Sequence, residues 1–335
     1  MTTKNNQELL QQIDRLHSKH RNNPQYIQIW NSLCIELNWF FLQENVKPQY
    51  KYINQLLRTT KYGRSWPFNS PLLNQPISIP GFYPMFFNYS LYMPKSELQH
   101  FTYGIYELAE TLLMLRIAPY IKSFIDVGAN IGYYSFLMSK FVPVTSFEPC
   151  SETYGYLLKG IEYNQLNVNA LKYAVSDIAG EQNLYLSDDP GHNSLCPAPE
   201  HNRQETIKAV TLEEYRSAQT LIKIDVEDHE ISVLKGMTQW LGSKKEAPLI
   251  MVESLAPNNK KVISILESYG YKVYSVNNKP KHGDLPLLPA SKSSPNWLAI
   301  PAWFTQDIFA PIDIRILTPS DKLLNLLKFL QEWDK

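Results

Sequence analysis

The sequence predicts an α/β protein in which a mostly parallel sheet carries helices on both faces. From about Lys122 onward, short apolar runs typical of strands alternate regularly with segments of helical spacing. A glycine-containing turn joins the first of these strands to the first helix, and acidic residues end several successive strands. In such sheets ligands bind beyond the carboxyl ends of the strands, so we expect the functional site at that edge.

The individual elements follow from the spacing of apolar residues. Strands are expected at 123–128, 144–149, 170–177, 220–228, 247–254, 271–276 and 295–302, and helices at 133–141, 152–164, 230–241 and 259–270. Segments 182–188 and 207–212 predict a hairpin. The loop between its strands, Asp188–Glu205, is long enough to act as a lid over a substrate.

The flanking regions differ from this pattern. Residues 1 to about 60 have helical spacing, residues 62–93 are irregular and rich in aromatic side chains, and residues 103–120 return to helical spacing. The final segment, 320–335, is typical of a capped amphipathic helix. We therefore expect an N-terminal region (1–100) that covers the site or selects the acceptor, a central ligand-binding domain (101–305) and a C-terminal helical extension (306–335).

Composition excludes some classes of partner. The chain of 335 residues has 32 basic and 32 acidic residues, so no overall field attracts nucleic acid or an anionic membrane. A signal peptide and a bilayer-spanning run are not evident. The cysteines, Cys34, Cys150 and Cys196, lack metal-ligand spacing. We expect a cytoplasmic protein without a structural metal.

The turn within "FIDVGANIGYYS" indicates the kind of ligand. Gly128 and Gly132 let a ligand approach the backbone closely. A dinucleotide fingerprint is incomplete, because Asn130 and Tyr133 occupy its second and third glycine positions, and a P-loop is absent. A pyrophosphate is thus disfavoured. Asp126 at the strand end suits a cofactor that has a positive end and no phosphate, and S-adenosylmethionine fits that description.

Two further acids end the next strands. Glu148, in "SFEP", stands about twenty residues beyond the glycine turn, where a carboxylate can accept both ribose hydroxyl protons. Asp177, in "AVSDIAG", follows the third strand and can reach an adenine amino group. Either acid alone is more typical of a helix cap or a solvated turn. Three acids at three successive strand ends favour the cofactor interpretation.

Together, "FIDVGANIGYYS", "FEP", "AVSDIAG" and "LIKIDVEDHEISVLKG" resemble the FkbM family of S-adenosylmethionine-dependent methyltransferases over about residues 103–276. The resemblance implies a class I methyltransferase sheet, Rossmann-like and mostly parallel with its last strand antiparallel, and methyl transfer that is usually to oxygen. By this resemblance the cofactor-binding residues are Asp126, Gly128, Asn130 and Gly132 for the methionine part and the turn, Glu148 for the ribose, Asp177 for the adenine, and Glu107 and Asp225 nearby. One departure is Asp228, which stands where the family usually has glycine.

The strand ends "KIDVEDHE" and "IMVES" supply the candidate catalytic residues, Asp225, Glu227, His229 and Glu253. A hydroxyl acceptor profits from a base, and His229 is the expected one because its reference pKa is near neutral. A carboxylate acceptor needs no base, but it needs cationic or hydrogen-bonding partners such as Lys223, His192 or Asn193. Asp225, Glu227 and Glu253 are also hard oxygen ligands suited to a divalent cation, an alternative that we rank below the metal-free one.

The sequence thus predicts an S-adenosylmethionine-dependent O-methyltransferase that acts on a hydroxyl or carboxylate of a small natural product of the sugar, lipid or peptide type. Two alternatives remain. An NAD-dependent oxidoreductase would share the alternating fold and Glu148, although the third glycine is missing. A non-catalytic interaction module on a methyltransferase fold would be consistent with Asp228 in place of glycine.

Overall fold

The computed structural model describes Arg15, Lys19 and residues 77–79, 89–91, 106–188, 190–277, 284–290 and 294–311. The helices predicted in residues 1–60 and 320–335 lie outside this part of the chain. Within the predicted irregular segment 62–93, two short strands, β1 (Ile77–Ile79) and β2 (Tyr89–Leu91), pair in antiparallel orientation, and β2 lies against helix α6 (Ser151–Asn164).

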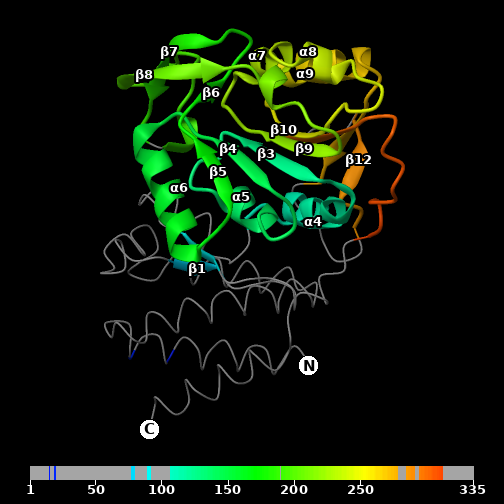
Figure 1. Ribbon diagram of the computed structural model, residues 1–335, viewed down its shortest axis with the longest axis horizontal. Coiled ribbons are helices and arrows are strands. Elements are labelled where there is room, and N and C mark those ends of the chain that lie inside the picture. Colours follow the sequence, from blue (N-terminus) through cyan, green and yellow to red (C-terminus); the bar gives the residue numbers. More distant parts are fainter. Residues whose placement is uncertain are drawn as a thin grey trace.

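An eight-stranded sheet forms the centre of the described part (Figure 1). Its strands are β3 (Ser123–Val127), β4 (Val144–Phe147), β5 (Val168–Leu171), β9 (Thr220–Ile224), β10 (Leu249–Glu253), β11 (Lys272–Val276), β12 (Leu287–Pro289) and β13 (Asn296–Ile300). They are ordered β12-β11-β13-β10-β9-β3-β4-β5. Strands β5, β4, β3, β9 and β10 are parallel, whereas β13 runs antiparallel between β10 and β11. This is the class I methyltransferase sheet, and the prediction of an antiparallel last strand is confirmed.

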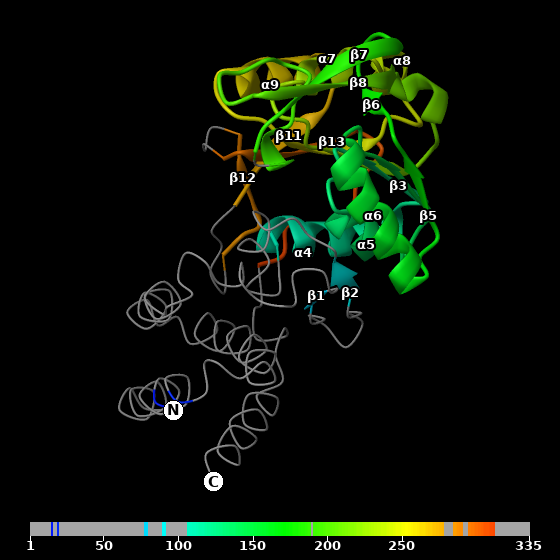
Figure 2. The ribbon, with the colours of Figure 1, turned by 90° about the vertical axis from the view of Figure 1, so that its left-hand side faces the viewer.

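Helices cover both faces of this sheet (Figure 2). Helices α4 (Leu108–Ile117), α5 (Tyr133–Met138) and α6 lie on one face, and α7 (Glu230–Lys235), α8 (Thr238–Leu241) and α9 (Asn258–Ser268) on the other. Successive strand residues point to opposite faces. Leu221 therefore packs in the core on the α4 side, and Ile222 packs in the core with Trp240 on the α7–α9 side. Because both faces are buried, the central strands are apolar runs.

A second sheet of three strands stands beside the first, in the order β6-β8-β7. The predicted hairpin is confirmed as β7 (Gly180–Leu186) and β8 (Arg203–Val210), which pair antiparallel. The prediction of a single strand over 170–177 is wrong. It divides into β5, in the large sheet, and β6 (Ala174–Val175), which pairs parallel with β8 in the small one. The described residues also form three short 3₁₀ helices: η3 (Ala118–Tyr120), η4 (Pro190–His192) and η5 (Leu212–Tyr215).

The helix expected over 230–241 is interrupted. Helix α7 ends at Lys235 and α8 begins at Thr238. Gly236 lies so close to the chain after β6 that a Cβ atom there would stand 2.1 Å from the carbonyl oxygen of Ser176. The break lets the helical layer pack against the small sheet. Strand β12 was not predicted, because three residues that include a proline give too weak a pattern.

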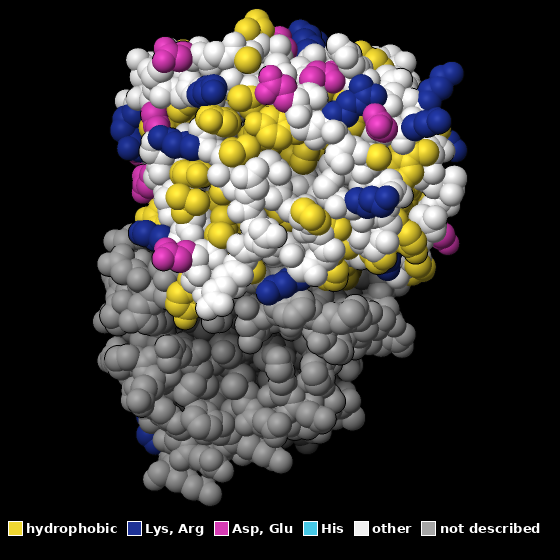
Figure 3. Space-filling view, viewed as in Figure 1, with side chains coloured by type: hydrophobic (Ala, Val, Ile, Leu, Met, Phe, Trp, Pro, Cys, Tyr) yellow, Lys and Arg dark blue, Asp and Glu magenta, His cyan; other side chains and the backbone are white. Residues whose placement is uncertain are grey.

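The surface of the described part is consistent with its even charge balance. Figure 3 shows basic and acidic side chains interspersed over one face, with apolar side chains between them. Among the described residues, helices long and apolar enough to cross a bilayer are absent.

Candidate cofactor and acceptor site

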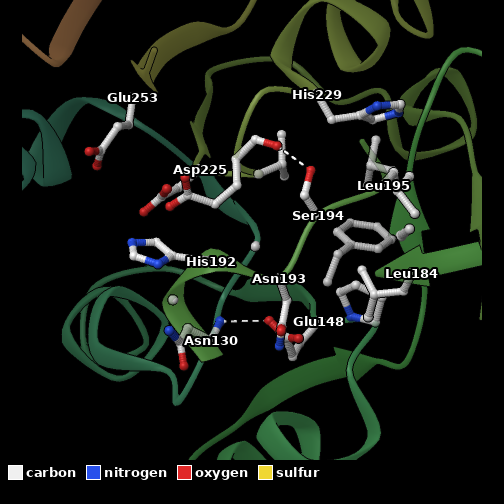
Figure 4. Close-up of a pocket in the computed structure, with 18 of the residues that line it drawn as sticks. Asn130, Glu148, Leu184, His192, Asn193, Ser194, Leu195, Asp225, His229 and Glu253 are labelled. Carbon is white, nitrogen blue, oxygen red and sulfur yellow. Dashed lines mark hydrogen bonds between the residues drawn. The ribbon is translucent and has the colours of Figure 1, made fainter. Parts of the chain in front are cut away.

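A cavity of about 280 Å³ opens at the carboxyl ends of β3, β4, β9 and β10 (Figure 4). The strand ends and their turns form one wall. The connection between β7 and β8 forms the opposite wall through residues 191–195. We call these the strand-end wall and the hairpin wall. Nine predicted site residues line the cavity: Gly128, Asn130, Glu148, His192, Asn193, Asp225, Glu227, His229 and Glu253.

Gly128 allows the turns after β3 and β9 to meet backbone to backbone. Its φ is +80°, a left-handed conformation that favours glycine. A Cβ atom at this position would stand 1.8 Å from the carbonyl oxygen of Asp225, well inside contact distance. The neighbouring strand ends are joined by a hydrogen bond from Asp225 N to Val127 O of 3.0 Å. Only glycine fits here, and its backbone forms part of the strand-end wall of the cavity.

Glu148 follows β4 and is held on both of its oxygens. The backbone N–H of Asn130 donates to Oε2 at 2.9 Å, and that of Cys150 donates to Oε1 at 3.0 Å. Burial raises the pKa of the carboxyl to about 7, although these two hydrogen bonds oppose the rise. Each oxygen keeps a lone pair for a further donor. Glu148 is thus a fixed acceptor that lies on the cavity wall.

Asn130 contributes an unsatisfied polar atom. Its φ of +49° places it in the left-handed region, where asparagine is tolerated. Its side-chain oxygen Oδ1 is buried, and within the described part of the chain it lacks a hydrogen-bond partner. Buried polar atoms are almost always paired, so an orphan on a cavity wall suits a bound group that donates. An amino-acid ammonium is such a group, and the residues present therefore fit S-adenosylmethionine.

Behind the strand-end wall lies a buried charged cluster around Lys223, which is 3% exposed. Its ammonium pairs with Asp225 at 2.6 Å and lies 4.9 Å from the centre of the Tyr134 ring. Burial lowers the pKa of Lys223, but the carboxylates of Asp225, Glu107 and Asp126 outweigh it and raise the pKa above its ordinary value. Lys223 stays charged and is paired with Asp225. It is not among the residues that line the cavity, although the sequence had predicted that it contacts the acceptor.

Glu227 and Glu253 line one end of the cavity, which we call the acidic end. Burial, with the charges of Asp225 and Glu107, raises the pKa of Glu253 to about 9. Burial and the charge of Asp225 likewise raise the pKa of Glu227 to about 8. Figure 4 shows Glu253, Asp225 and His192 together at this end of the cavity. A cation bound here would favour the ionised carboxylates.

The opposite end of the cavity is largely apolar. Leu184 and Leu195 lie at this end (Figure 4), and Phe147, Tyr173 and Val175 also line the cavity. These residues had not been predicted, because they carry no motif and come together only when the small sheet docks beside β4. A flat apolar ring is the natural occupant of such a space.

His229 lies at this apolar end, next to Leu195 and away from Glu253 (Figure 4). Its Nε2 is 3.0 Å from Ser176 Oγ, and burial lowers its pKa. The prediction of His229 as the base that deprotonates the acceptor is therefore not supported by its position. The turn Glu227–Asp228, whose φ angles are both positive, carries the chain from the acidic end to the other side.

The left-handed conformation of Asp228, with a φ of +67°, explains why the FkbM family usually has glycine there. Two side chains from other segments of the chain hold this turn. Ser194 Oγ donates to the carbonyl oxygen of Glu227, and Asn258 Nδ2 donates to Asp228 Oδ1 at 3.1 Å. These contacts offset the local strain, so Asp228 keeps the turn without a glycine.

Five predicted site residues lie outside the cavity lining. Asp126 is buried behind the wall and accepts from Ser135 Oγ at 2.5 Å; Glu107 accepts from Tyr134 OH at 2.7 Å. Gly132 is the N-cap residue of helix α5, and Lys223 lies in the charged cluster. Asp177 is exposed and accepts from Ser176 Oγ at 3.1 Å. Three of these residues do not line the cavity but influence it through their charges: Asp126, Glu107 and Lys223.

The described residues include no group of three or more His, Cys, Asp or Glu side chains arranged to hold a metal ion.

The fold and the site define a class I methyltransferase domain, with a cavity at the strand ends suited to a cationic nucleoside cofactor. Residues 126–273 match the family described as "Methyltransferase FkbM domain". The predicted resemblance to this family is confirmed over that part of the chain. S-adenosylmethionine is the methyl donor that such a domain implies.

One curated relative is the protein named "Hexuronic acid methyltransferase AglP" of Haloferax volcanii. It is 31% identical over 123 residues, which are 35% of this chain and 51% of that protein. The chain thus spans about half the length of this relative.

Solved structures with a similar arrangement include a precorrin-6y C5,15-methyltransferase from Geobacter metallireducens, with a TM-score of 0.32 and 14% identity over 58% of this chain and 87% of that one. Another is a TehB-like SAM-dependent methyltransferase from Corynebacterium glutamicum, with a TM-score of 0.37 and 10% identity over 61% and 92%. At these scores the fold assignment depends on the strand order itself.

Proposed function

We propose that this protein transfers a methyl group from S-adenosylmethionine to an oxygen atom of a small natural product, with a sugar-type acceptor as the leading class. One observation carries the proposal. Glu148 stands at the end of β4 with both oxygens fixed by backbone amides, and it faces a cavity whose floor is the bare backbone of Gly128. The name of the relative from Haloferax volcanii, a hexuronic acid methyltransferase, supports the sugar class.

The cavity suggests where each part of the cofactor binds. The adenine would occupy the apolar end, between Phe147 and Leu195, and the ribose hydroxyls would donate to Glu148. The amino-acid part would lie over Gly128, with its ammonium donating to Asn130 Oδ1. When bound, the cofactor supplies a methyl group on a positively charged sulfur, already activated for transfer to a nucleophile. The protein's main contribution is to place acceptor and donor in line.

The acceptor would enter at the acidic end, beside Glu253, Glu227 and His192. A hydroxyl acceptor has a proton to lose. His192 replaces His229 as our candidate for the residue that receives it, because it lies beside Asp225 and opposite Glu253 (Figure 4). A neighbouring carboxylate stabilises the imidazolium that forms. If the acceptor is instead a carboxylate, no base is needed, and His192 and Asn193 are available to hydrogen-bond to it.

Several finer assignments belong to the same proposal. We infer a cytoplasmic enzyme of natural product biosynthesis with a small-molecule or peptide acceptor and no nucleic-acid substrate. The free thiols of Cys150 and Cys196 are consistent with a reducing compartment. We also retain the domain limits 101–305, which enclose both sheets.

The test is a methyl-transfer assay with an isotope-labelled methyl donor. Acceptors would be offered in matched pairs, such as a glucuronic acid glycoside and the corresponding neutral glucoside. Mild alkali removes the label from a methyl ester and leaves it in a methyl ether, so the product reports which oxygen was methylated. Transfer to either oxygen, lost in Glu148→Ala, supports the proposal. Binding of NADH together with failure to bind S-adenosylhomocysteine would contradict it.

A further inference from the structure

Both ring nitrogens of His201 are used within the connection between β7 and β8. The backbone N–H of Ala198 donates to Nδ1 at 2.8 Å, and Nε2 lies 2.8 Å from the carbonyl oxygen of His192. An N–H can only donate and a carbonyl can only accept. His201 is therefore a neutral imidazole that carries its proton on Nε2. It joins Ala198, which follows the hairpin wall, to His192 within that wall.

The ring of His201 is supported from β7. It stacks on Tyr185, with ring centres 6.1 Å apart and planes inclined by 25°. Tyr185 in turn exchanges two backbone hydrogen bonds with Ser194, of 2.8 and 3.0 Å. A further bond from Ser187 N to Asn193 Oδ1, at 3.0 Å, closes the loop on its other side. The loop is thus hydrogen-bonded internally, with His201 between its two limbs.

This loop presents consecutive side chains to the cavity. His192 faces the acidic end beside Asp225, Asn193 lies next to Glu148, and Leu195 reaches the apolar end (Figure 4). Ser194 lines the cavity between them and also donates to the carbonyl oxygen of Glu227 on the facing wall. His201 itself is not among the cavity-lining residues. Any effect it has on a bound ligand must therefore pass through the hairpin wall.

We propose that His201 is a positioning residue, which holds the hairpin wall against the bound cofactor through its two hydrogen bonds. The inference rests on the proposed cofactor site, because the wall matters only if the cavity holds the cofactor. Losing both bonds lets the segment 191–195 move away from Glu148 and Gly128. We expect this loss to weaken cofactor binding without unfolding the two sheets.

The test measures the affinity for S-adenosylhomocysteine by calorimetry in the full chain. His201→Phe keeps an aromatic ring on Tyr185 but loses both hydrogen bonds, and we expect it to bind about tenfold more weakly than wild type. His201→Gln offers an amide donor and acceptor at nearly the same separation, and should recover part of that loss. Glu200→Gln, a change at an exposed neighbour outside the cavity lining, is the matched control and should bind as wild type does.

A double-mutant cycle distinguishes positioning from a general structural role. If His201 acts through the wall, the losses from His201→Phe and Asn193→Ala should not add, because each disturbs the same segment. Additive losses would overturn the proposal, as would His201→Phe binding with wild-type affinity. If His201→Phe does not fold, the nitrogen chemical shifts of His201 in the wild type decide. A proton on Nδ1, or on both nitrogens, at neutral pH would contradict the assignment.

The two proposals fail in different ways. If the wild-type chain does not bind S-adenosylhomocysteine, the proposed function fails whatever the variants do. If the wild type binds and only the His201 series behaves otherwise than expected, the function stands and the positioning role fails.

Discussion

The two walls of the cavity are built on different principles. The strand-end wall consists of turns of the eight-stranded sheet, with Gly128 packed on the backbone of Asp225 and the Asp225 carboxylate paired with the buried Lys223 behind it. The hairpin wall belongs to the three-stranded sheet. It is held by hydrogen bonds between backbone atoms and side chains: His201 and Ser194 donate to carbonyl oxygens, and Asn193 accepts from a backbone N–H.

This difference suggests that the two walls have different roles in stability and in ligand binding. A change at the backbone contact in the strand-end wall disturbs the global fold, because the turns after β3 and β9 pack directly on each other there. A change in the hairpin wall alters the cavity while the two sheets remain intact. The wall that carries Gly128 and Glu148 therefore suits the constant ligand, the cofactor. The wall that carries His192 is the one that can vary with the acceptor.

The largest expected effect is at Gly128. Gly128→Ala places a methyl group against the Asp225 carbonyl in a left-handed conformation. We expect the free energy of unfolding to fall by several kcal/mol, roughly 3 or more, and S-adenosylhomocysteine binding to be lost. Chemical denaturation and calorimetry measure both.

The matched control for this prediction is Gly155→Ala in helix α6, where a Cβ atom meets nothing within 4 Å. It should raise the free energy of unfolding by about 0.5–1 kcal/mol, because alanine favours a helix. Equal behaviour of the two variants would contradict the close packing of Gly128 on the backbone of Asp225.

Glu148 should affect binding more than stability. Glu148→Gln keeps the shape of the side chain but removes the charge and one of its two acceptor oxygens. We expect S-adenosylhomocysteine to bind about 10- to 100-fold more weakly, since charge-assisted hydrogen bonds to the ribose are lost. Glu152→Gln, at an exposed position in the first turn of α6 outside the cavity lining, is the control and should bind S-adenosylhomocysteine as the wild type does. Wild-type affinity in Glu148→Gln would remove Glu148 from the cofactor site.

The same carboxyl predicts a pH dependence. Its pKa of about 7 in the free protein leaves it mostly protonated at pH 6 and mostly ionised at pH 8. Ribose hydroxyls donate to the ionised form, so the affinity for S-adenosylhomocysteine should rise with pH over that interval, by up to about tenfold. In Glu148→Gln this part of the rise should disappear. An affinity that falls with pH in the wild type would contradict the assignment.

The linked effect on stability has the opposite sign. Because burial raises the pKa of Glu148 above the ordinary 4.5, the folded state holds its proton more tightly than the unfolded state does. The contribution of Glu148 to the free energy of unfolding is therefore complete below about pH 4.5 and is lost as the pH rises to about 7. Comparing denaturation of the wild type and Glu148→Gln across this range isolates it.

The smallest expected effect concerns the turn where the two walls meet. Asp228→Gly relieves a left-handed conformation and loses the hydrogen bond from Asn258 on the exposed side. We expect the free energy of unfolding to rise by about 0.5 kcal/mol, measured by denaturation. A fall of more than about 1 kcal/mol would show that the Asn258 contact, rather than Ser194, holds the turn.

The two walls also differ in how far the sequence could predict them. The strand-end wall was predictable, because Gly128, Asn130 and Glu148 follow strands whose parallel ends must meet at one edge. The apolar end was not, because Leu184 and Leu195 arrive there through the docking of the small sheet, a long-range event with no local pattern. The position of His229 could not be predicted for a related reason. It is four residues from Asp225 in sequence, but the left-handed turn of Glu227 and Asp228 moves it to the other end of the cavity.

The most direct test of the account is isothermal calorimetry of the wild-type chain with S-adenosylhomocysteine, with NAD as the comparison ligand. The cavity has Glu148 for a ribose and an orphan acceptor for an ammonium, but it lacks the third glycine of a pyrophosphate turn. We therefore predict binding of S-adenosylhomocysteine in the micromolar range and none of NAD. Binding of NAD with no heat from S-adenosylhomocysteine would contradict it.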